Sequence, residues 1–417
     1  MRLLLYLVPA SCLALFAQAT PTLTLDQAVR EAMSNNLDLT AARYGITIAE
    51  ARQITAALRP NPVLTASADH LDLLGTGYNA INNGGPNEYA LRTDFVLERG
   101  GKRAARINLA AADRSVAQLS FQDAMRRLHF EVASAFVDVQ TAKENLTLAQ
   151  DNLRTLNSIV AINSARVATG DLAGVELERS QVAALQYQTE VRQAELRLRQ
   201  SKTALQLLLG RAGMALEFDV AGSIRRDTGM LLLEDLRTRA QAQRPDLLAV
   251  RQSQARNQAD LRLQLAQGKI DYTAGVEYRR QQAANAYGNS IGLYFSAPLP
   301  VFNRNQGEIV RAQRETEQAA AQIRALSARV ENEIAATWQQ YTTSRGLLED
   351  IETNMLAKAK SVRERTDYSY RRGEASFIEF LDAQRSFNEV MQSYNDARAG
   401  YARSLYLLDS VSSAPQP

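Results

Sequence analysis

Cysteine and histidine are nearly absent from this sequence of 417 residues, which contains only Cys12, His70 and His129. One thiol cannot form a disulfide within the chain, and neither histidine has a histidine or cysteine at the spacing of a helical metal site. The glycines do not gather into a phosphate-binding loop either. The sequence therefore offers no catalytic residues, no cofactor site and no metal site, and we do not expect an enzyme.

Long apolar runs and blocks of one charge are also scarce. The exception is the N-terminus, where Arg2 precedes an apolar run up to Phe16 and the small-residue pattern of a signal-peptidase site at 17–19. We predict a signal peptide over 1–19, with acylation of Cys12 as the alternative. The rest has no apolar stretch of membrane-helix length. The whole chain has a formal charge of +3 without a basic block, so nucleic acid is not an expected partner.

Proline is missing from two long intervals, 87–244 and 301–414. An interior proline costs a helix about 3 kcal/mol, so these intervals can hold long helices. Within the first, apolar or small residues recur at alternating steps of four and three from Leu128 to Val160 and from Leu177 to Leu208. The pattern predicts an antiparallel helical hairpin, although heptads alone also suit a coiled-coil scaffold.

The sequence contains two copies of one unit. An offset of 208 residues aligns 25–39 with 233–247, and Gly101 is matched by Gly307 at the start of each long helix. The predicted organisation is a signal peptide at 1–19, a first copy at 20–213, a linker at 214–230, a second copy at 231–411 and a tail at 412–417. Long helices are expected at about 101–168 and 305–372, return helices at about 172–210 and 375–410, and hairpin turns at Gly170 and Gly373.

Four shorter segments alternate apolar and polar residues with a period of two. Residues 271–279, 290–297 and 88–97 show this clearly, and 63–70 more weakly. We predict strands at about 62–72, 88–98, 270–280 and 289–299. Their length suits tilted membrane strands with one face toward lipid and one toward water. Four strands cannot close a barrel in lipid, so three chains with twelve strands are expected; a small soluble sheet capping a bundle is the alternative.

These features resemble the TolC-type outer-membrane efflux family over essentially the whole chain after the signal. The resemblance rests on Leu25-Asp26-Gln27-Ala28, on Arg244-Pro245-Asp246-Leu247 and on the segment from Gly373 to Gln384. The segment from Pro298 to Gly307 is similar to the heavy-metal branch of that family (CzcC-like, cobalt-zinc-cadmium).

The family resemblance implies a mainly α fold with membrane β structure. It implies a homotrimer with a twelve-stranded β-barrel in the outer membrane of a Gram-negative bacterium and an α-helical barrel in the periplasm. The implied partners are a periplasmic adaptor (membrane fusion protein), an inner-membrane RND-type pump and outer-membrane lipid. The expected function is a passive exit duct of a tripartite efflux system, with heavy-metal cations as substrate. The alternatives are a multidrug or protein export duct, or a periplasmic coiled-coil structural protein without a pore.

The resemblance also assigns roles near the hairpin turns. Glu379 and Asp382 match the acidic rings of the family, and three copies of each in a constriction would favour cations. Acids at these positions are equally typical of an ordinary helix N-terminus.

The same region is expected to hold a gate and a docking surface. Glu176 and Tyr370 match gate positions, and because Ala375 replaces an arginine of the family, Arg371 or Arg372 is expected to pair with Glu176 across a subunit interface. The adaptor is expected to contact the hairpin tips at these residues: Arg166, Gly170 and Gly373.

Overall fold

A computed structural model of the chain describes residues 22–71, 73–75, 87–211, 213, 218–227, 229, 231–282 and 287–413. The predicted signal peptide, with Cys12, lies outside the described residues. The chain forms two compact units. The tip unit contains the described residues up to Asn36, 129–227 and 343–406; the sheet unit contains 37–128, 228–342 and the described residues from 407 onward. Each unit includes segments of both sequence copies, so the copies are not separate domains.

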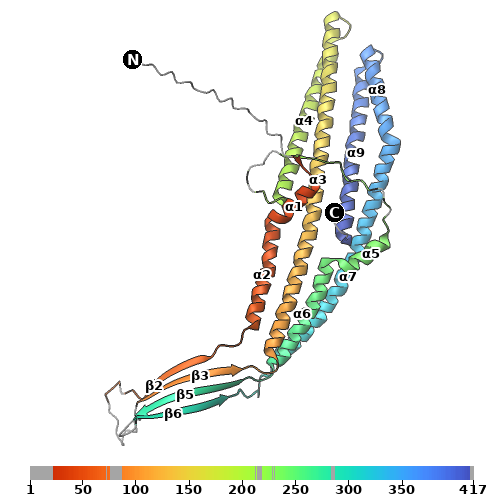
Figure 1. Cartoon of the computed structure of the whole chain (residues 1–417). Coiled ribbons are helices and arrows are strands. Elements are labelled where there is room, and N and C mark those ends of the chain that lie inside the picture. Colours follow the sequence, from red (N-terminus) through yellow and green to blue (C-terminus); the bar gives the residue numbers. More distant parts are fainter. Residues whose placement is uncertain are drawn as a thin grey trace, which may run out of the picture. The chain divides into compact units, whose positions relative to one another are not determined.

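A four-stranded antiparallel sheet lies in the sheet unit (Figure 1). Its strands, in the order β2-β3-β5-β6, are β2 (Val63–Asp69), β3 (Glu88–Leu97), β5 (Tyr272–Gln282) and β6 (Tyr287–Ser296). Each copy supplies one hairpin, and the pairing of β3 with β5 joins them. β6 stops before the predicted 299 because Pro298 and Pro300 have no amide hydrogen for the ladder.

Helices of both copies lie side by side in the same unit (Figure 1). They are α2 (Leu37–Ala57), the first part of α3 (Lys102–Thr169), α6 (Pro245–Gln267) and most of α7 (Gln306–Asp350). The short helix α5 (Leu233–Gln243) precedes α6. Ion pairs connect neighbouring helices: Glu50 with Arg114 at 3.0 Å, Asp113 with Arg256 at 2.9 Å, and Asp260 with Arg311 at 2.9 Å.

Two antiparallel helical hairpins form the tip unit. The first is α3 with α4 (Gly174–Leu208), and the second is α8 (Leu356–Arg372) with α9 (Phe377–Ser412). The 68 residues of α3 correspond to a length of roughly 100 Å at 1.5 Å per residue. At the other end of the unit are α1 (Leu25–Asn35) and a parallel pairing of β1 (Thr22–Leu23) with β4 (Asp219–Val220).

The second long helix differs from the prediction of one continuous helix over 305–372. A π-helical turn at Ile351–Met355 separates α7 from α8. A seam of apolar residues along α7, with Ile334, Tyr341 and Leu348, is buried and continues to Ile351, but Met355 is 45% exposed. A wider turn changes the angular phase of the helix, so the residues that follow no longer continue the same seam.

The starts of the two long helices also differ from the predicted match of Gly101 with Gly307. Gly101 precedes α3 with a φ of 73°, whereas Gly307 is already inside α7. The residue before α7 is Asn305, with a φ of 64°. Asparagine tolerates this left-handed conformation, and its side-chain amide donates to the carbonyl oxygen of Gln264 at 2.8 Å. The equivalent conformation is therefore made by a different residue type in each copy.

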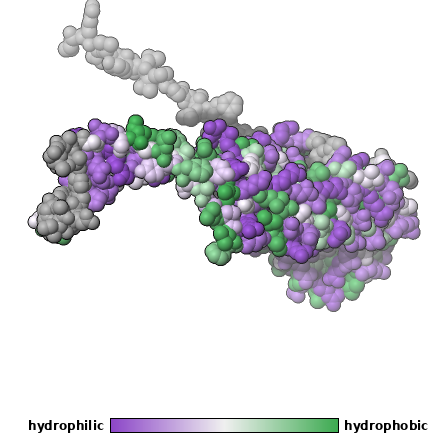
Figure 2. Space-filling view, turned by 90° about the horizontal axis from the view of Figure 1, so that it is seen from below, coloured by the Kyte–Doolittle hydropathy of each residue, from purple (hydrophilic) through white to green (hydrophobic). Residues whose placement is uncertain are grey.

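Hydrophobic residues reach the surface in several places. Figure 2 shows them interspersed with hydrophilic residues on the face in view. None of the helices in the described ranges combines the length and apolar composition of a membrane span.

Candidate functional site

The two hairpin turns have the same backbone geometry. Gly170 and Gly373 both have a φ of 82°, which an L-residue rarely adopts. In each turn the glycine amide and the next amide donate back to carbonyl groups in the last turn of the helix. The predicted equivalence of the two turns is therefore visible in the structure.

Arg166 connects the two turns within one chain. Its Nη2 donates to the carbonyl oxygen of Arg371 at 2.6 Å, and its guanidinium lies 6.0 Å from the ring centre of Tyr370. A groove of about 530 Å³ lies beside this contact. Its lining includes residues of both turns: Arg166, Asp171, Glu176, Tyr370, Arg372 and Phe377.

Tyr370 is the centre of the apolar core behind the turns. It is 3% exposed, and its ring centre lies 5.9 Å from that of Phe377 and 5.3 Å from that of Phe380. Its hydroxyl donates to Oδ1 of Asn163 on α3 at 2.7 Å. Burial raises the pKa of the phenol, and the hydrogen bond to Asn163 opposes this only in part. Within the chain, Tyr370 thus links α8 to α3 and α9.

The other predicted gate residues also have partners within the chain. Nη2 of Arg371 donates to the hydroxyl of Ser158 on α3 at 3.0 Å, and the remaining partners are close in sequence. Glu176 accepts from Nη1 of Arg179 at 2.7 Å. Arg371 donates to Asp367 at 2.8 Å, and the guanidinium of Arg372 lies 4.6 Å from the ring centre of Tyr368. Their pairing with Glu176 was predicted between subunits, so it stays a prediction.

Glu379 has a defined structural role at the start of α9. Its Oε2 accepts from the backbone amide of Ser376 at 2.7 Å and from the Ser376 hydroxyl at 2.9 Å, while the Glu379 amide donates to that hydroxyl at 3.3 Å. This reciprocal arrangement is a capping box. The bonds from Ser376 lower the pKa of Glu379, so the carboxylate is ionised at neutral pH. Asp382, one turn further along α9, is exposed.

A row of buried polar side chains connects the two hairpins below the turns. Nε2 of Gln384 donates to Oδ1 of Asn152 at 2.9 Å and to Oδ1 of Asn388 at 3.2 Å, and Nδ2 of Asn388 donates to the hydroxyl of Tyr187 at 3.2 Å. Burial is the main cause that raises the pKa of Tyr187 to about 12. The tyrosine therefore stays neutral over the physiological range.

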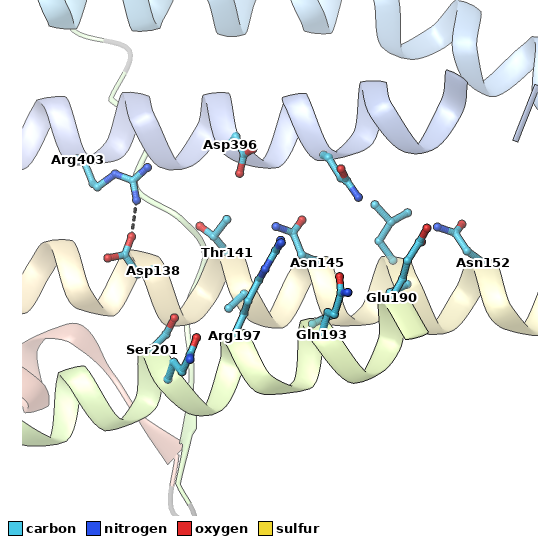
Figure 3. A pocket seen from close by; sticks show the side chains of 16 residues that line it. Asp138, Thr141, Asn145, Asn152, Glu190, Gln193, Arg197, Ser201, Asp396 and Arg403 are labelled. Carbon is cyan, nitrogen blue, oxygen red and sulfur yellow. Dashed lines mark hydrogen bonds and ion pairs between the residues drawn. The ribbon is translucent and has the colours of Figure 1, made fainter. Parts of the chain in front are cut away.

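A polar groove of about 570 Å³ lies further along the same helices (Figure 3). It is bordered by Asp138 and Asn145 of α3, by Glu190 and Arg197 of α4, and by α9, where Arg403 is paired with Asp138. Small residues of the two predicted seams line it, which leaves the space open: Ala142, Ala149, Ala194 and Ser201. Among the described residues, no three His, Cys, Asp or Glu side chains converge as metal ligands would.

Sequence reasoning missed several of these partners. The capping box was readable, because Ser376 stands three residues before Glu379. The partnership of Tyr370 with Asn163 joins residues 207 positions apart, so no local pattern could indicate it. The same holds for the contact of Gln384 with Asn152.

A known protein family matches this chain in two segments, one in each sequence copy. The model of the family "Outer membrane efflux protein" matches residues 28–211 and 236–412. The chain belongs to this family. The outer-membrane location and the efflux role predicted from the sequence are thereby confirmed, and the family supplies the outer-membrane component of tripartite efflux systems.

Individual relatives are distant but cover most of the chain. The cobalt-zinc-cadmium resistance protein CzcC of Cupriavidus metallidurans is 25% identical over 382 residues, covering 90% of this chain and 87% of the relative. The cation efflux system protein CusC of Escherichia coli is 24% identical, with 90% and 82% covered. A membrane protein from Pseudomonas aeruginosa has the same fold, with a TM-score of 0.77, 18% identity and coverage of 94% and 91%. The predicted fold class is therefore confirmed.

Proposed function

We propose that this chain is one of three identical subunits of a passive exit duct for heavy-metal cations. The duct receives its cargo from an inner-membrane pump of the RND type through a periplasmic adaptor, and it releases the cargo outside the cell. Membership of the outer membrane efflux family carries the proposal. The trimer, the partners and the cargo are proposed in addition to family membership.

The sheet supports assembly with further copies. Among the described strands, β2 and β6 each have a neighbour on one side only. Ile291, Leu293 and Phe295 of β6 are 69–83% exposed. In lipid, an open strand edge leaves backbone groups without hydrogen bonds, so the edges need partners from other chains. Three chains would provide twelve strands and close a barrel.

Exposed apolar residues on the helices support the same assembly. Val182 and Leu185 of α4 are 55% and 63% exposed, and Tyr44 and Ile54 of α2 are 64% and 69% exposed. Apolar side chains on helix faces are stabilised when a further subunit covers them.

The entrance proposed at the hairpin turns combines charge with a built-in cap. Glu379 and Asp382 would each form a ring of three carboxylates in the trimer. The cap holds the Glu379 carboxylate in place and keeps it ionised, so its structural role is compatible with an electrostatic one. Glu176 with Arg371 or Arg372 of a neighbouring subunit would close the entrance at rest. The adaptor would dock on the turns at Arg166, Gly170 and Gly373.

The test of the duct is conductance of the purified protein in a planar lipid bilayer. We expect cation-selective steps that lose selectivity in the variant Glu379→Gln with Asp382→Asn. Ser376→Ala is the matched control, because it removes a capping partner without removing a carboxylate. Protein that gives no steps would support the alternative of a structural coiled-coil protein without a pore.

The cargo is tested separately. Similarity to CzcC and CusC supports metal cations, since their names state metal resistance and cation efflux. We expect deletion of the gene to lower tolerance to cobalt, zinc or cadmium, and the wild-type gene to restore it. Unchanged metal tolerance with increased sensitivity to organic compounds would instead favour a multidrug duct.

A further inference from the structure

An ionic cluster covers the polar face of the sheet and joins the two sequence copies. Arg92 of β3 stands directly opposite Glu277 of β5. Arg279 donates to Glu88 across the strands at 2.6 Å and lies 3.0 Å from Glu277 on its own strand. Arg92 is paired with Asp94 at 2.8 Å. Both arginines are therefore held by carboxylates.

Tyr294 of β6 completes the cluster. Its hydroxyl donates to Oε1 of Glu277 at 2.8 Å, and the guanidinium of Arg92 lies 4.0 Å from its ring centre. Glu277 consequently has three cationic or hydroxyl neighbours and is only 7% exposed, although it lies on a sheet surface.

Two glycines make room for these side chains. A Cβ atom at Gly292 would lie 3.0 Å from the ring carbon Cε2 of Tyr294, and one at Gly275 would collide with the carboxylate of Asp94. The ring and the carboxylate therefore occupy the space above the glycine backbones and lie against the sheet. A larger residue at either glycine would push the charged groups away from it.

Among the residues that the structure describes, the opposite face of the sheet has no such cluster. It exposes large apolar side chains from three strands: Leu91, Tyr278, Ile291, Leu293 and Phe295. If the proposed function holds, this face meets lipid, and strand alternation then turns the ionic cluster toward the aqueous lumen.

The cluster contains more negative than positive charge. Glu88, Asp94 and Glu277 are opposed by Arg92 and Arg279, so each chain contributes a surplus of one carboxylate. An assembly of three chains repeats that surplus around the lumen. Charged rings of this kind decide which sign of ion passes.

We propose that Glu277 determines ion specificity in the sheet-lined part of the duct, at a site separate from Glu379 and Asp382. It holds the guanidinium group of Arg279 and the hydroxyl of Tyr294 against the wall and maintains the negative surplus. The preferred ions are small hydrated cations. This inference rests on the proposed duct.

Reversal potentials across a planar bilayer under a potassium chloride gradient test the proposal. Glu277→Gln removes one negative charge at nearly constant size, and the cation-to-anion permeability ratio should fall roughly twofold or more. Arg279→Gln removes one positive charge, and the ratio should rise. A residue with a merely structural role would not produce shifts of opposite sign.

The double variant Glu277→Gln with Arg279→Gln is the matched control. It removes one negative and one positive charge, so the net charge is unchanged and the permeability ratio should stay close to that of the wild type. It also provides a second route if one single variant fails to assemble. If the wild type forms channels and the cation-to-anion permeability ratio is unchanged in both single variants, this inference is wrong and the proposed duct still stands. Wild-type protein that forms no channels overturns the proposed function, and the inference with it.

Discussion

The two units place apolar side chains in opposite positions, although both are assembled from the same two sequence copies. In the tip unit, Leu156, Ile159 and Phe380 are buried between helices. On the sheet, Glu277 is nearly buried while Leu293 is 83% exposed. The period of an apolar pattern therefore identifies a face but does not say what covers it. In the tip unit the chain covers the apolar face between its two hairpins, whereas on the sheet we propose that lipid covers the apolar face.

The copies are also joined by different chemistry. In the tip unit, neutral amides such as Gln384 and Asn152 make the connection inside a buried interface. In the sheet, the ion pair of Glu88 with Arg279 makes it on a polar surface. The difference follows from desolvation, because an unpaired charge is far more costly to bury than an amide with a hydrogen-bond partner.

Removal of a core aromatic side chain should have the largest effect. Phe380→Ala is expected to lower the free energy of unfolding by about 3–5 kcal/mol, because it leaves a cavity beside Tyr370 and Phe377. Circular dichroism during urea unfolding in detergent would measure this. The control is Ile378→Ala, two residues earlier and 67% exposed, which should change little. Equal losses would contradict the assignment of the core.

A charge on the exposed face of the sheet should have a comparable effect. Leu293→Arg is expected to cost about 2–4 kcal/mol if the side chain lies near the middle of the bilayer. Ser296→Arg, on the other face of the same strand, should be tolerated. The measurement is the fraction of assembled protein in the outer membrane. Equal fractions of assembled protein for both variants would contradict the assignment of one face to lipid and the other to water.

Loss of a buried amide should have an intermediate effect. Gln384→Ala leaves Asn152 without its hydrogen bond and is expected to lower the free energy of unfolding by about 1–3 kcal/mol. Gln392→Ala, on an exposed position of the same helix, is the control. A similar loss in the control would show that the amide row does not hold the hairpins together.

Acid should weaken the sheet unit through Asp246. Burial alone would raise the pKa of this carboxyl, but the hydrogen bonds and charge of Arg244 outweigh it and hold the pKa below its usual value. A lowered pKa in the folded state stabilises the fold above the unfolded pKa of about 3.9, and this contribution is lost as the pH falls through the folded value. Wild type should therefore be more stable than Asp246→Asn at pH 7, and the difference in Tm should shrink below about pH 4. A difference in Tm that stays constant with pH would contradict the contribution of Asp246 ionisation to stability.

The helix cap should have the smallest effect. Ser376→Ala removes a hydroxyl from the capping box and is expected to cost about 1 kcal/mol, measured by urea unfolding. Ser393→Ala, exposed in the middle of α9, should cost less. A larger loss in the control would exclude the cap as the cause.

Sequence patterns were informative where the physical cause is local. The turns at Gly170 and Gly373 need a positive φ, and the strands alternate because successive side chains point to opposite faces. The patterns were less informative where the helical phase changes within a helix, or where one copy uses a different residue type at an equivalent position. The π turn at Ile351–Met355 has no local signature. Asn305 takes the place of a glycine because asparagine tolerates the left-handed conformation, and its side chain bonds to Gln264 on α6.

The sequence by itself determined the family, the two copies and the types of the main elements, because backbone preferences and periodicity act over a few residues. Only the tertiary structure decided which residues meet: Tyr370 with Asn163, Arg166 with the carbonyl of Arg371, and Arg92 with Tyr294. These contacts join segments that are distant in sequence, and packing of the two copies against each other brings them together. Physical proximity of this kind is not encoded in any one segment.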